Sequence, residues 1–380
     1  MSVAKLRQSA RRTRLWWCLR AVTYNFHRLL SAASSTQHAL EMSLKRIAEE
    51  LGLSLTTVSR AMNGYPEVAA ATRRAVLEAA ARMDYRADAR ARGLALGRAD
   101  AVGIVFPITT GDLGDQQFLQ VASAMSERFA QSGLDLLIVS ASVDDELAAY
   151  ERAITGRHIG VFVVPRTRVR DRRLELLQAR NVAFVAYGRS ASLTSEYAWF
   201  DFDNLAGARM ATERLLRLGH RRLGYLGADP DYNFADQRYA GFCASLQAAG
   251  IPLNPLAVQR TALERRSGYA AMQKLLALPQ RPTAVLVDNN LAGIGAVHAV
   301  LQSGLVLGRD LSMIVYDGLG SDSVVRTAVT AVMQPTPITT GIALAEMTLA
   351  RLREEPLESL QKLCLPELEI GDSDGPPLAS

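Results

Sequence analysis

Two kinds of hydrophobic pattern follow one another along the chain. Between residues 43 and 85, apolar positions recur every three or four residues, which is typical of amphipathic helices. From residue 101 onward, short apolar runs alternate with longer amphipathic stretches. Alternation of strands and helices over this length predicts parallel sheets in two doubly wound units. We therefore expect an α/β protein with an all-α N-terminal domain and a two-lobed core of two doubly wound parallel sheets.

The expected strands of the core are apolar runs of five or six residues: Ala101–Phe106, Asp135–Ser140, Gly160–Val164, Val182–Tyr187, Arg222–Gly227, Ala284–Asp288 and Leu311–Tyr316. The expected helices lie between them, at 118–132, 145–155, 204–218, 236–249, 267–277 and 291–303.

Three short helices are expected in the N-terminal pattern. The first buries one face, formed by Leu44, Ile47, Ala48 and Leu51. Gly52 ends this helix and allows a tight turn, after which Ser54 caps a second helix that runs to Met62. The outward side of that second helix carries Leu55, Thr56, Ser59 and Arg60, and a third helix follows Thr72. The pattern predicts a helix-turn-helix, although an ordinary three-helix subdomain has the same periodicity.

The residues of this segment closely resemble the LacI family of bacterial regulators. The resemblance rests on SLKRIAEELGLS at 43–54, TVSRAMNG at 57–64, and TRRAVL at 72–77 followed by Tyr85. It implies that base edges in the major groove are read by Leu55, Thr56 and Arg60, of which Arg60 suits a bidentate bond to guanine. It implies that phosphates are held by Thr57, Ser59 and Asn63. Ala69 departs from the family, which has a capping Ser or Asn there, and the change costs about 1 kcal/mol of helix stability.

Residues 86–98 resemble the hinge of the same family. In relatives this segment forms a short helix on DNA, and its leucine enters the minor groove and kinks the duplex. The resemblance places Leu94 at the wedge position and Ala91 one turn earlier. Ala87 and Asp88 replace the commoner Pro-Asn, and Asp88 brings negative charge toward the phosphates. A plain exposed linker is the alternative interpretation.

The resemblance continues over residues 99–370, which look like a periplasmic sugar-binding fold with crossovers between lobes near 200–204, 331–335 and 364. Ligands of such sheets bind beyond the carboxyl ends of the strands, in the cleft between the lobes. Arg238 and Asp317 match the family's effector-holding arginine and buried aspartate. The other candidates are the strand-end residues Arg189, Asp288 and Asn289 and the aromatic residues Phe118 and Phe234. Arginine, carboxylates and amides around an aromatic surface suit the hydroxyls and ring face of a saccharide.

Charge is distributed unevenly along the chain. Residues 1–41 carry seven basic and one acidic residue, and residues 42–98 carry ten basic and six acidic residues. Residues 99–380 carry 26 basic and 31 acidic residues, so the overall charge of +5 hides a basic first quarter on an acidic body. This asymmetry favours a nucleic-acid-binding domain joined to a domain that does not bind DNA.

Three widely spaced cysteines, and no run of eighteen apolar residues, lead us to expect a cytoplasmic, nucleoid-associated protein without a membrane partner.

The expected domain plan has five parts. Residues 1–41 share no pattern with the rest and are expected to be an extension that is disordered or foreign to the native protein, with translation starting at Met42. The other parts are a helix-turn-helix domain at 42–86, a hinge at 87–98, an effector-binding and dimerisation domain at 99–370, and a tail at 371–380. No leucine heptads follow residue 370, which favours a homodimer over a tetramer.

These observations predict a sequence-specific transcription regulator that binds a near-palindromic double-stranded operator as a homodimer. The resemblance implies a repressor of sugar uptake or catabolism genes that is controlled by a saccharide between the lobes. A purine or other non-sugar corepressor in the same cleft is the alternative. A solute-binding protein of a transporter, or an architectural DNA-binding protein without a ligand, fits the combined patterns less well. The sequence holds no dinucleotide fingerprint, phosphate loop, nucleophile arrangement or metal-ligand spacing, so we expect no enzyme, cofactor or metal site.

Overall fold

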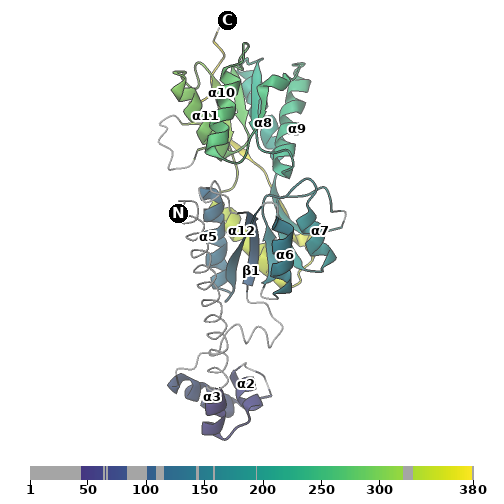
Figure 1. The fold of residues 1–380 in the computed structure, drawn as a ribbon, viewed down its shortest axis with the longest axis vertical. Coiled ribbons are helices and arrows are strands. Elements are labelled where there is room, and N and C mark those ends of the chain that lie inside the picture. The colour runs from purple at the N-terminus through teal and green to yellow at the C-terminus, as the bar shows by residue number, and fades with distance from the viewer. Residues whose placement is uncertain are drawn as a thin grey trace, which may run out of the picture. The chain divides into compact units, whose positions relative to one another are not determined.

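The computed structural model describes residues 44–62, 65, 67–83, 101–107, 115–142, 145–156, 159–193, 195–319 and 328–378. The chain divides into two units, Met1–Gly97 and Arg98–Ser380. Figure 1 shows a small helical body and two larger α/β lobes. Several expectations fall outside the described residues: the extension 1–41, the phosphate contact Asn63, and the hinge 87–98 with Ala87, Asp88, Ala91 and Leu94.

The first unit contains the three expected helices. A helix over residues 44–51 is followed by α2 (Leu55–Met62) and α3 (Ala70–Arg82). Their shared core is formed by Ile47, Ala48, Val58, Ala61, Val76, Ala79 and Ala80. Because this small core leaves one side of each helix in solvent, the outward side of α2 is available to a partner.

The turn between the first two helices has the geometry that its residues favour. Gly52 has φ +60°, a conformation that L side chains rarely adopt. The backbone N–H of Leu53 then donates to the carbonyl of Ala48 at 2.9 Å. Ser54 Oγ accepts from the backbone N–H of Thr57 at 3.1 Å and so caps α2. In contrast, α3 begins after Ala69 without a side-chain cap, which confirms the predicted loss of that cap.

The first lobe of the second unit is built on a six-stranded parallel sheet. Its strands are β1 (Ala101–Pro107), β2 (Asp135–Ala141), β3 (Ile159–Val164), β4 (Ala183–Tyr187), β5 (Ala198–Phe202) and β11 (Gln361–Cys364), in the order β11-β5-β4-β3-β1-β2. Its helices are α5 (Gln116–Ala130), α6 (Glu146–Thr155), α7 (Arg172–Ala179) and α12 (Pro337–Leu352). One core cluster joins the sheet to α5 and α12, and another joins it to α6 and α7, so both faces are covered.

The second lobe repeats this plan. Its strands are β6 (Leu223–Gly227), β7 (Val258–Arg260), β8 (Ala284–Val287), β9 (Ser312–Tyr316), β10 (Thr330–Met333) and β12 (Glu367–Glu369), in the order β12-β10-β9-β8-β6-β7. All neighbours are parallel except β12, which runs antiparallel to β10. Its helices are α8 (Asn204–Arg217), α9 (Asn233–Ala248), α10 (Arg265–Leu276) and α11 (Asn290–Gln302). Core clusters cover one face with α10 and α11 and the other with α8 and α9.

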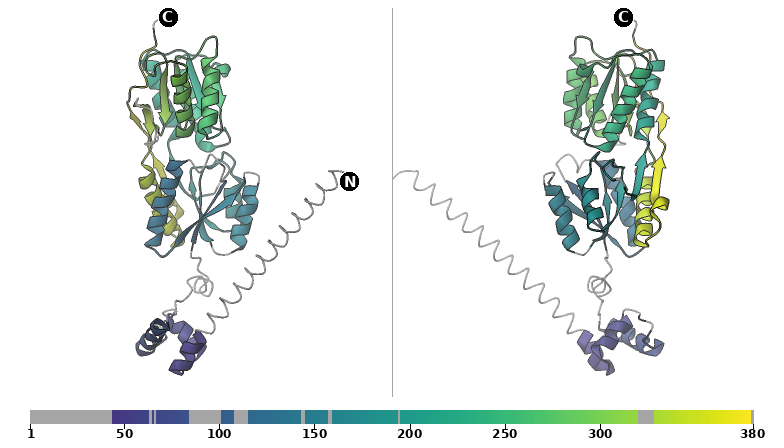
Figure 2. Two further views of the ribbon diagram at one scale, coloured as in Figure 1. Left: turned by 60° about the vertical axis from the view of Figure 1, so that its left-hand side comes forward. Right: turned by 90° about the vertical axis from the view of Figure 1, so that its right-hand side faces the viewer.

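The chain passes between the lobes three times. It leaves the first sheet after β5, returns after β10, and crosses again between β11 and β12. Two of these connections are hydrogen-bonded to one another, because the backbone N–H of Asp203 donates to the carbonyl of Cys364 at 2.9 Å. Figure 2 shows the connections, in teal and yellow, along one side of the two lobes.

Residues 371–378 belong to the second lobe, which corrects the expectation of a tail beginning at residue 371. Ser373 is fully buried; its hydroxyl donates to the carbonyl of Met313 at 2.6 Å and accepts from the N–H of Thr330 at 2.8 Å. Asp374 pairs with Arg214 of α8. This docking could not be predicted from hydrophobic pattern, because the segment has few apolar residues and is held through polar groups.

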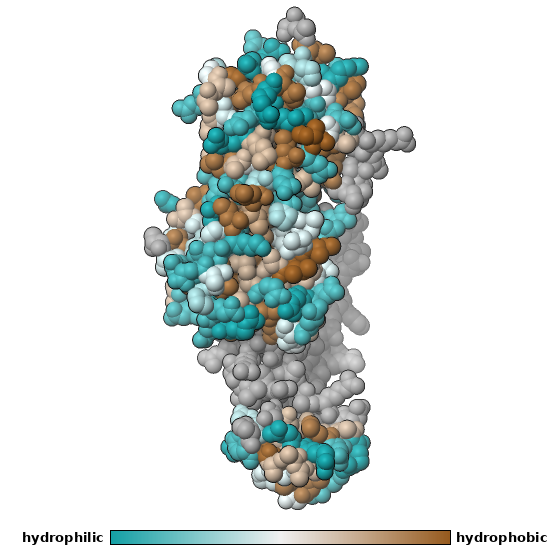
Figure 3. Space-filling view, turned by 180° about the vertical axis from the view of Figure 1, so that it is seen from behind, coloured by the Kyte–Doolittle hydropathy of each residue, from teal (hydrophilic) through white to brown (hydrophobic). Residues whose placement is uncertain are grey.

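The surface of the lobes is mixed in character. On the face seen in Figure 3, apolar side chains gather in patches among hydrophilic ones. Among the described residues, no helix combines the length and the apolar character that a membrane crossing requires.

Candidate functional site

A cavity of about 250 Å³ lies between the two lobes, at the carboxyl ends of both sheets. Parallel strands present their carboxyl ends at the same edge of a sheet, so loops from both lobes converge here. The cavity is lined by polar residues, Asp115, Gln117, Arg166, Thr167, Asp201, Asn204, Arg238, Asn289, Asn290, Asp317, Gln334 and Thr336. The remaining lining residues are Phe118, Val121, Pro165, Tyr187, Gly188, Phe202, Phe234, Leu263, Leu291, Met333, Pro335 and Pro337.

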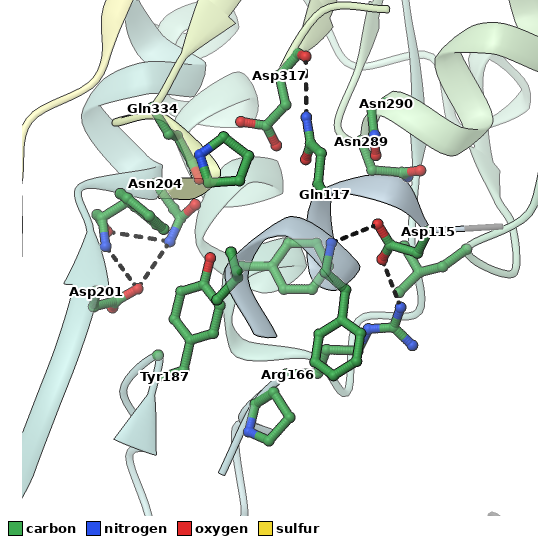
Figure 4. Close-up of a pocket in the computed structure, with 18 of the residues that line it drawn as sticks. Asp115, Gln117, Arg166, Tyr187, Asp201, Asn204, Asn289, Asn290, Asp317 and Gln334 are labelled. Carbon is green, nitrogen blue, oxygen red and sulfur yellow. Dashed lines mark hydrogen bonds and ion pairs between the residues drawn. The ribbon is translucent and has the colours of Figure 1, made fainter. Parts of the chain in front are cut away.

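The wall from the first lobe combines an aromatic stack with an ion pair. Phe118 stacks on Phe106 with ring centroids 4.1 Å apart, and the guanidinium of Arg166 lies over Phe106 at 4.6 Å. Asp115 Oδ1 accepts from the N–H of Phe118 at 3.1 Å and caps α5, while its Oδ2 accepts from Arg166 Nη2 at 3.0 Å (Figure 4). Arg166 has φ +49°, an uncommon value for a residue with a side chain. Such strained backbone is concentrated at binding sites.

A glycine shapes the neighbouring part of this wall. Gly188 follows Tyr187 at the end of β4 with φ +113°. A Cβ at this position would lie 2.1 Å from the hydroxyl oxygen of Thr167. Only glycine therefore lets the segment after β3 pack against the end of β4, next to Tyr187.

The wall near the crossovers is held by Asp201 and Asn204. Asp201 Oδ1 accepts from the N–H of Phe202 at 2.8 Å and from Asn204 Nδ2 at 3.4 Å. Burial raises the pKa of Asp201, against the opposing effect of Arg189. Gln334 lies nearby, and its Nε2 is buried without a hydrogen-bond partner among the described residues.

The wall from the second lobe is organised around Arg238 of α9. Its Nε donates to Asn204 Oδ1 at 2.8 Å, and its Nη1 donates to the carbonyl of Asp288. The guanidinium lies 3.7 Å from the ring centroid of Tyr316 and 4.9 Å from that of Phe234. These contacts fix the plane of the guanidinium, and no described residue accepts a hydrogen bond from its Nη2.

Asp317 follows β9 and faces the same cavity (Figure 4). It has φ +59°, and its carbonyl accepts from Gln117 Nε2 of the first lobe at 3.4 Å. No described residue donates a hydrogen bond to its carboxylate. Burial raises the pKa of Asp317 to about 6, with Arg238 acting in the opposite direction and Asp115 adding to the rise.

A second candidate site is the outward side of α2. Leu55 is 49% exposed, and Thr56 and Arg60 are exposed beside it. Thr57 and Ser59 are half-buried along the same helix. Apolar and polar groups with one arginine on an exposed helix are the groups that contact base edges and phosphates.

Comparison with known families accounts for both sites. Residues 43–88 match the bacterial regulatory proteins of the lacI family. Residues 99–363 match the family described as periplasmic binding proteins and sugar binding domain of the LacI family. The chain belongs to the LacI family. The predicted family, the predicted fold class and the predicted role as a transcription regulator are thereby confirmed.

Individual members of the LacI family match over most of their length. The HTH-type transcriptional regulator RafR of Escherichia coli is 36% identical over 84% of this chain and 95% of RafR. A solved complex of the transcriptional regulator CelR with cellobiose is 25% identical, with a TM-score of 0.65 over 87% of this chain and 99% of CelR. The lac repressor dimer, solved with operator and the anti-inducer ONPF, is 24% identical with a TM-score of 0.72 over 87% and 98% of the two chains, and supports the fold.

Five of the seven effector residues predicted from this LacI-family sequence line the cavity: Phe118, Phe234, Arg238, Asn289 and Asp317. Arg189 and Asp288 do not line it. Arg189 Nε donates to Asp201 Oδ2 at 2.7 Å, and its guanidinium lies 5.2 Å from the ring of Trp199. Arg189 therefore supports Asp201, which lines the cavity, and does not line the cavity itself.

Asp288 is fully buried and faces away from the cavity. Its carboxylate accepts from Tyr225 Oη and from the N–H of Ala228, each at 3.0 Å, and from Asn289 Nδ2 at 2.8 Å. Burial raises the pKa of Asp288, with Arg238 opposing the rise. Asp288 thus positions Asn289 and, through its carbonyl, Arg238.

Several lining residues were not predicted from the sequence. Asp201 lies in β5, Asn204 follows β5 at the start of α8, and Gln334 follows β10, and neither strand was among the expected ones. Tyr187 ends an expected strand, and this position at a strand end could have identified it as a lining residue. Within the parts of the chain that the structure describes, no group of His, Cys, Asp and Glu side chains is arranged to hold a metal ion.

Proposed function

We propose that the cavity binds a saccharide and that its occupancy controls how strongly this LacI-family regulator binds its operator. The observation that carries the proposal is a set of hydrogen-bonding groups without partners among the described residues: Arg238 Nη2, Gln334 Nε2 and the Asp317 carboxylate. Two donors and an acceptor complement hydroxyl groups, which both donate and accept. The stacked Phe118 supplies apolar surface for a sugar ring.

The family description and one solved complex support a sugar, although PurR repressors are also among the relatives. The family that matches residues 99–363 is described as a sugar binding domain, and CelR was solved with cellobiose. By this proposal, Phe118, Phe234, Arg238, Asn289 and Asp317 contact the effector, and Arg189 and Asp288 hold the contacting residues in place.

Replacement of Gln334 by Leu tests the proposal. An unpartnered buried amide costs about 1–3 kcal/mol, so Gln334→Leu should make the ligand-free protein more stable. It should also weaken sugar binding about tenfold, because one hydrogen bond to the ligand is lost. Titration calorimetry of the full chain against mono- and disaccharides, with nucleobases in parallel, measures the second effect.

The control is Gln178→Leu, which removes an amide of α7 that is bonded to Ser195 outside the cavity. It should leave sugar binding unchanged. Binding of a nucleobase and no saccharide would reject the proposed ligand. Undiminished sugar affinity in Gln334→Leu would reject the placement of the sugar in this cavity.

For DNA we propose the roles that the family resemblance implies. Leu55, Thr56 and Arg60 read bases, Thr57, Ser59 and Asn63 hold phosphates, and Ala91 and Leu94 enter the minor groove. The exposure of Leu55, Thr56 and Arg60 on α2 supports the first assignment. We further propose that residues 42–86 form the reader, 87–98 the hinge and 99–378 the sensor.

The physiological setting follows from these roles. LacI-family regulators bind operator DNA as dimers, and we propose a homodimer on a near-palindromic operator that represses genes of sugar uptake or catabolism. The relatives are transcription regulators, and we propose that this chain likewise performs no catalysis and acts in the cytoplasm, where the DNA is.

A further inference from the structure

The two lobes are joined by a short backbone bridge beside the cavity. Thr167–Val169, after β3, lies antiparallel to Asp231–Asn233, before α9. The N–H of Val169 donates to the carbonyl of Asp231 at 2.8 Å, and the N–H of Asn233 donates to the carbonyl of Thr167 at 2.9 Å. We call these two segments, residues 167–169 and 231–233, the latch.

The latch lies away from the three crossovers. In the first sheet, β4 separates β3 from the crossover strands β5 and β11. In the second sheet, β8 and β9 separate β6, which leads into the latch, from the crossover strands β10 and β12. Two bodies that are connected along one side open farthest on the other side. Opening of the lobes therefore separates the two halves of the latch farther than it separates atoms at the crossovers.

A buried charge cluster fixes one half of the latch to the first lobe. Arg173 Nη1 donates to Glu146 Oε1 at 2.7 Å, and both side chains are 5% exposed. Arg173 also donates two hydrogen bonds to Asp171, from Nε to Oδ1 at 2.9 Å and from Nη2 to Oδ2 at 2.7 Å. Burial raises the pKa of Asp171, but the hydrogen bonds and charge of Arg173 outweigh burial, so the pKa is lowered overall and the carboxylate stays ionised.

Arg168 connects this cluster to the second lobe. Its Nη2 donates to Glu146 Oε2 and its Nη1 donates to Asp231 Oδ2, both at 3.2 Å. Its backbone N–H donates to Asp171 Oδ2 at 2.9 Å. The Asp231 side chain is 51% exposed, and among the described residues Arg168 is its ion-pair partner. Of these ion pairs, the one between Arg168 and Asp231 is thus the most exposed to solvent and the weakest. It is also the ion pair that connects the two lobes.

The latch is continuous with the cavity on both sides. Arg166 and Thr167 line the cavity, and the carbonyl of Arg166 accepts from Arg173 Nη2 at 2.9 Å. On the other side Phe234 lines the cavity, and its ring stacks on Tyr232 at 5.7 Å. Separation of the latch therefore moves cavity walls that belong to both lobes.

We propose that residues 167–169 and 231–233 hold the lobes closed, that the Arg168–Asp231 ion pair sets the balance between closed and open cavity, and that this balance alters operator affinity. Arg168 and Asp231 are positioning residues: they act on the lobes and make no contact with the ligand. The proposal does not depend on the ligand being a saccharide.

Hydrogen exchange of the ligand-free full chain tests the first two parts. In Asp231→Asn and in Arg168→Met, the amides of Val169 and Asn233 should exchange at least tenfold faster. The matched control is Arg180→Met, which breaks an ion pair with Glu151 inside the first lobe and should leave both amides unchanged. Asp231 is half-exposed, so its replacement spares the buried cluster and the fold. Equal exchange in Asp231→Asn and the control would overturn the latch.

A reducible crosslink tests the link to DNA. Arg168 and Tyr232 face each other as a pair without mutual hydrogen bonds, a geometry with Cα atoms about 4.5 Å apart. This spacing suits a disulfide. Arg168→Cys with Tyr232→Cys, in a chain whose Cys18, Cys243 and Cys364 are replaced by Ser, should oxidise readily. Oxidation should slow exchange at Val169 and Asn233.

Operator affinity is then compared between the oxidised and reduced crosslink variant, on a DNA fragment selected from a random pool with the unmodified full chain. We expect a difference of at least tenfold that a reducing agent abolishes. Failure of the crosslink to form would overturn the latch geometry. Equal operator affinity in the two redox forms would overturn its control of DNA binding. Neither measurement contains a sugar, so a failed sugar assignment leaves both outcomes readable.

Discussion

At the scale of single residues, the cavity is defined by polar groups held in place by neighbours. Arg238 is fixed by Asn204 and by the carbonyl of Asp288, and Asp115 is fixed by the start of α5. Such support keeps donors and acceptors oriented before a ligand arrives, which reduces the entropy that binding costs. The backbone of Arg166 and of Asp317 has a positive φ, which is uncommon for residues with a side chain. This backbone conformation fixes the position from which each side chain reaches the cavity.

Asp317 makes sugar binding depend on pH. Burial raises its pKa to about 6, so the carboxylate is ionised above pH 6 and becomes protonated as the pH falls through 6. The ionised form only accepts hydrogen bonds and makes the stronger, charge-assisted ones, whereas protonation turns one oxygen into a donor and removes the charge. We expect sugar affinity to be highest above pH 7 and to fall as the pH drops from 7 to 5, measured by calorimetry.

Asp317→Asn is the control for this dependence, because asparagine also tolerates the positive φ of this position. Its affinity should be lower at pH 7.5 and nearly flat with pH. A dependence in Asp317→Asn as steep as in the unmodified protein would assign the titration to another group.

Arg60 should determine one base of the operator. Its exposed position on α2 suits a bidentate contact with guanine, which discriminates by about 1–3 kcal/mol. We expect Arg60→Ala to weaken binding to the selected operator and to relax the preference at one position of each half-site, measured on a set of single-base variants. Arg46→Ala removes the same charge from the preceding helix and should change all variants equally. A preference that is intact in Arg60→Ala would place the base contact elsewhere.

At the scale of secondary structure elements, the missing cap of α3 is a local weakness. Ala69 has φ −54° and ψ 140°, which fits a capping residue, but its side chain offers no acceptor. Ala69→Ser should stabilise the start of α3 by about 1 kcal/mol. Hydrogen exchange of the first α3 amides in the full chain should slow about fivefold. Ala71→Ser, inside the helix, is the control and should not slow exchange.

The elements that the sequence predicted are those with strong apolar character. All seven expected strands were found, because each of them is an apolar run in a parallel sheet, and all of them except the edge strand β2 are largely buried. The five strands that were missed are short or lie toward the edges of the sheets, and β11 and β12 consist largely of polar residues. The site residues show the consequence: Asp201 lies in a missed strand and Asn204 and Gln334 follow missed strands, whereas Arg238 and Asp317 were found through the family resemblance.

Arg189 shows a different limit of sequence reasoning. It follows β4, at the correct end of the sheet, yet its side chain pairs with Asp201 instead of lining the cavity. The position of a residue at a strand end is encoded locally. The choice between facing a ligand and supporting a neighbour depends on a partner from another strand, which one sequence does not disclose.

At the scale of the whole protein, one edge of the first lobe has no neighbouring strand among the described residues, and we expect a second copy to pack there. β2 is an edge strand, and its Leu137 and Ile138 are 39% and 43% exposed. Next to β2 lies α5, which packs against α12, and these helices expose Leu119, Ile338 and Ile342. A long apolar edge strand is normally covered. Because we propose that this regulator acts as a homodimer, we expect this surface to be the dimer contact.

Ile138→Asp tests this contact. An aspartate buried in an apolar interface loses its hydration without gaining a partner, which costs several kcal/mol. We therefore expect dissociation into monomers at micromolar concentration, measured by sedimentation velocity, with operator affinity falling because one monomer contacts a single half-site. Leu256→Asp changes a more exposed leucine of the second lobe and should leave the dimer intact. If Ile138→Asp stays dimeric while Leu256→Asp dissociates, the dimer forms through the second lobe, and the edge of β2 is free for another partner.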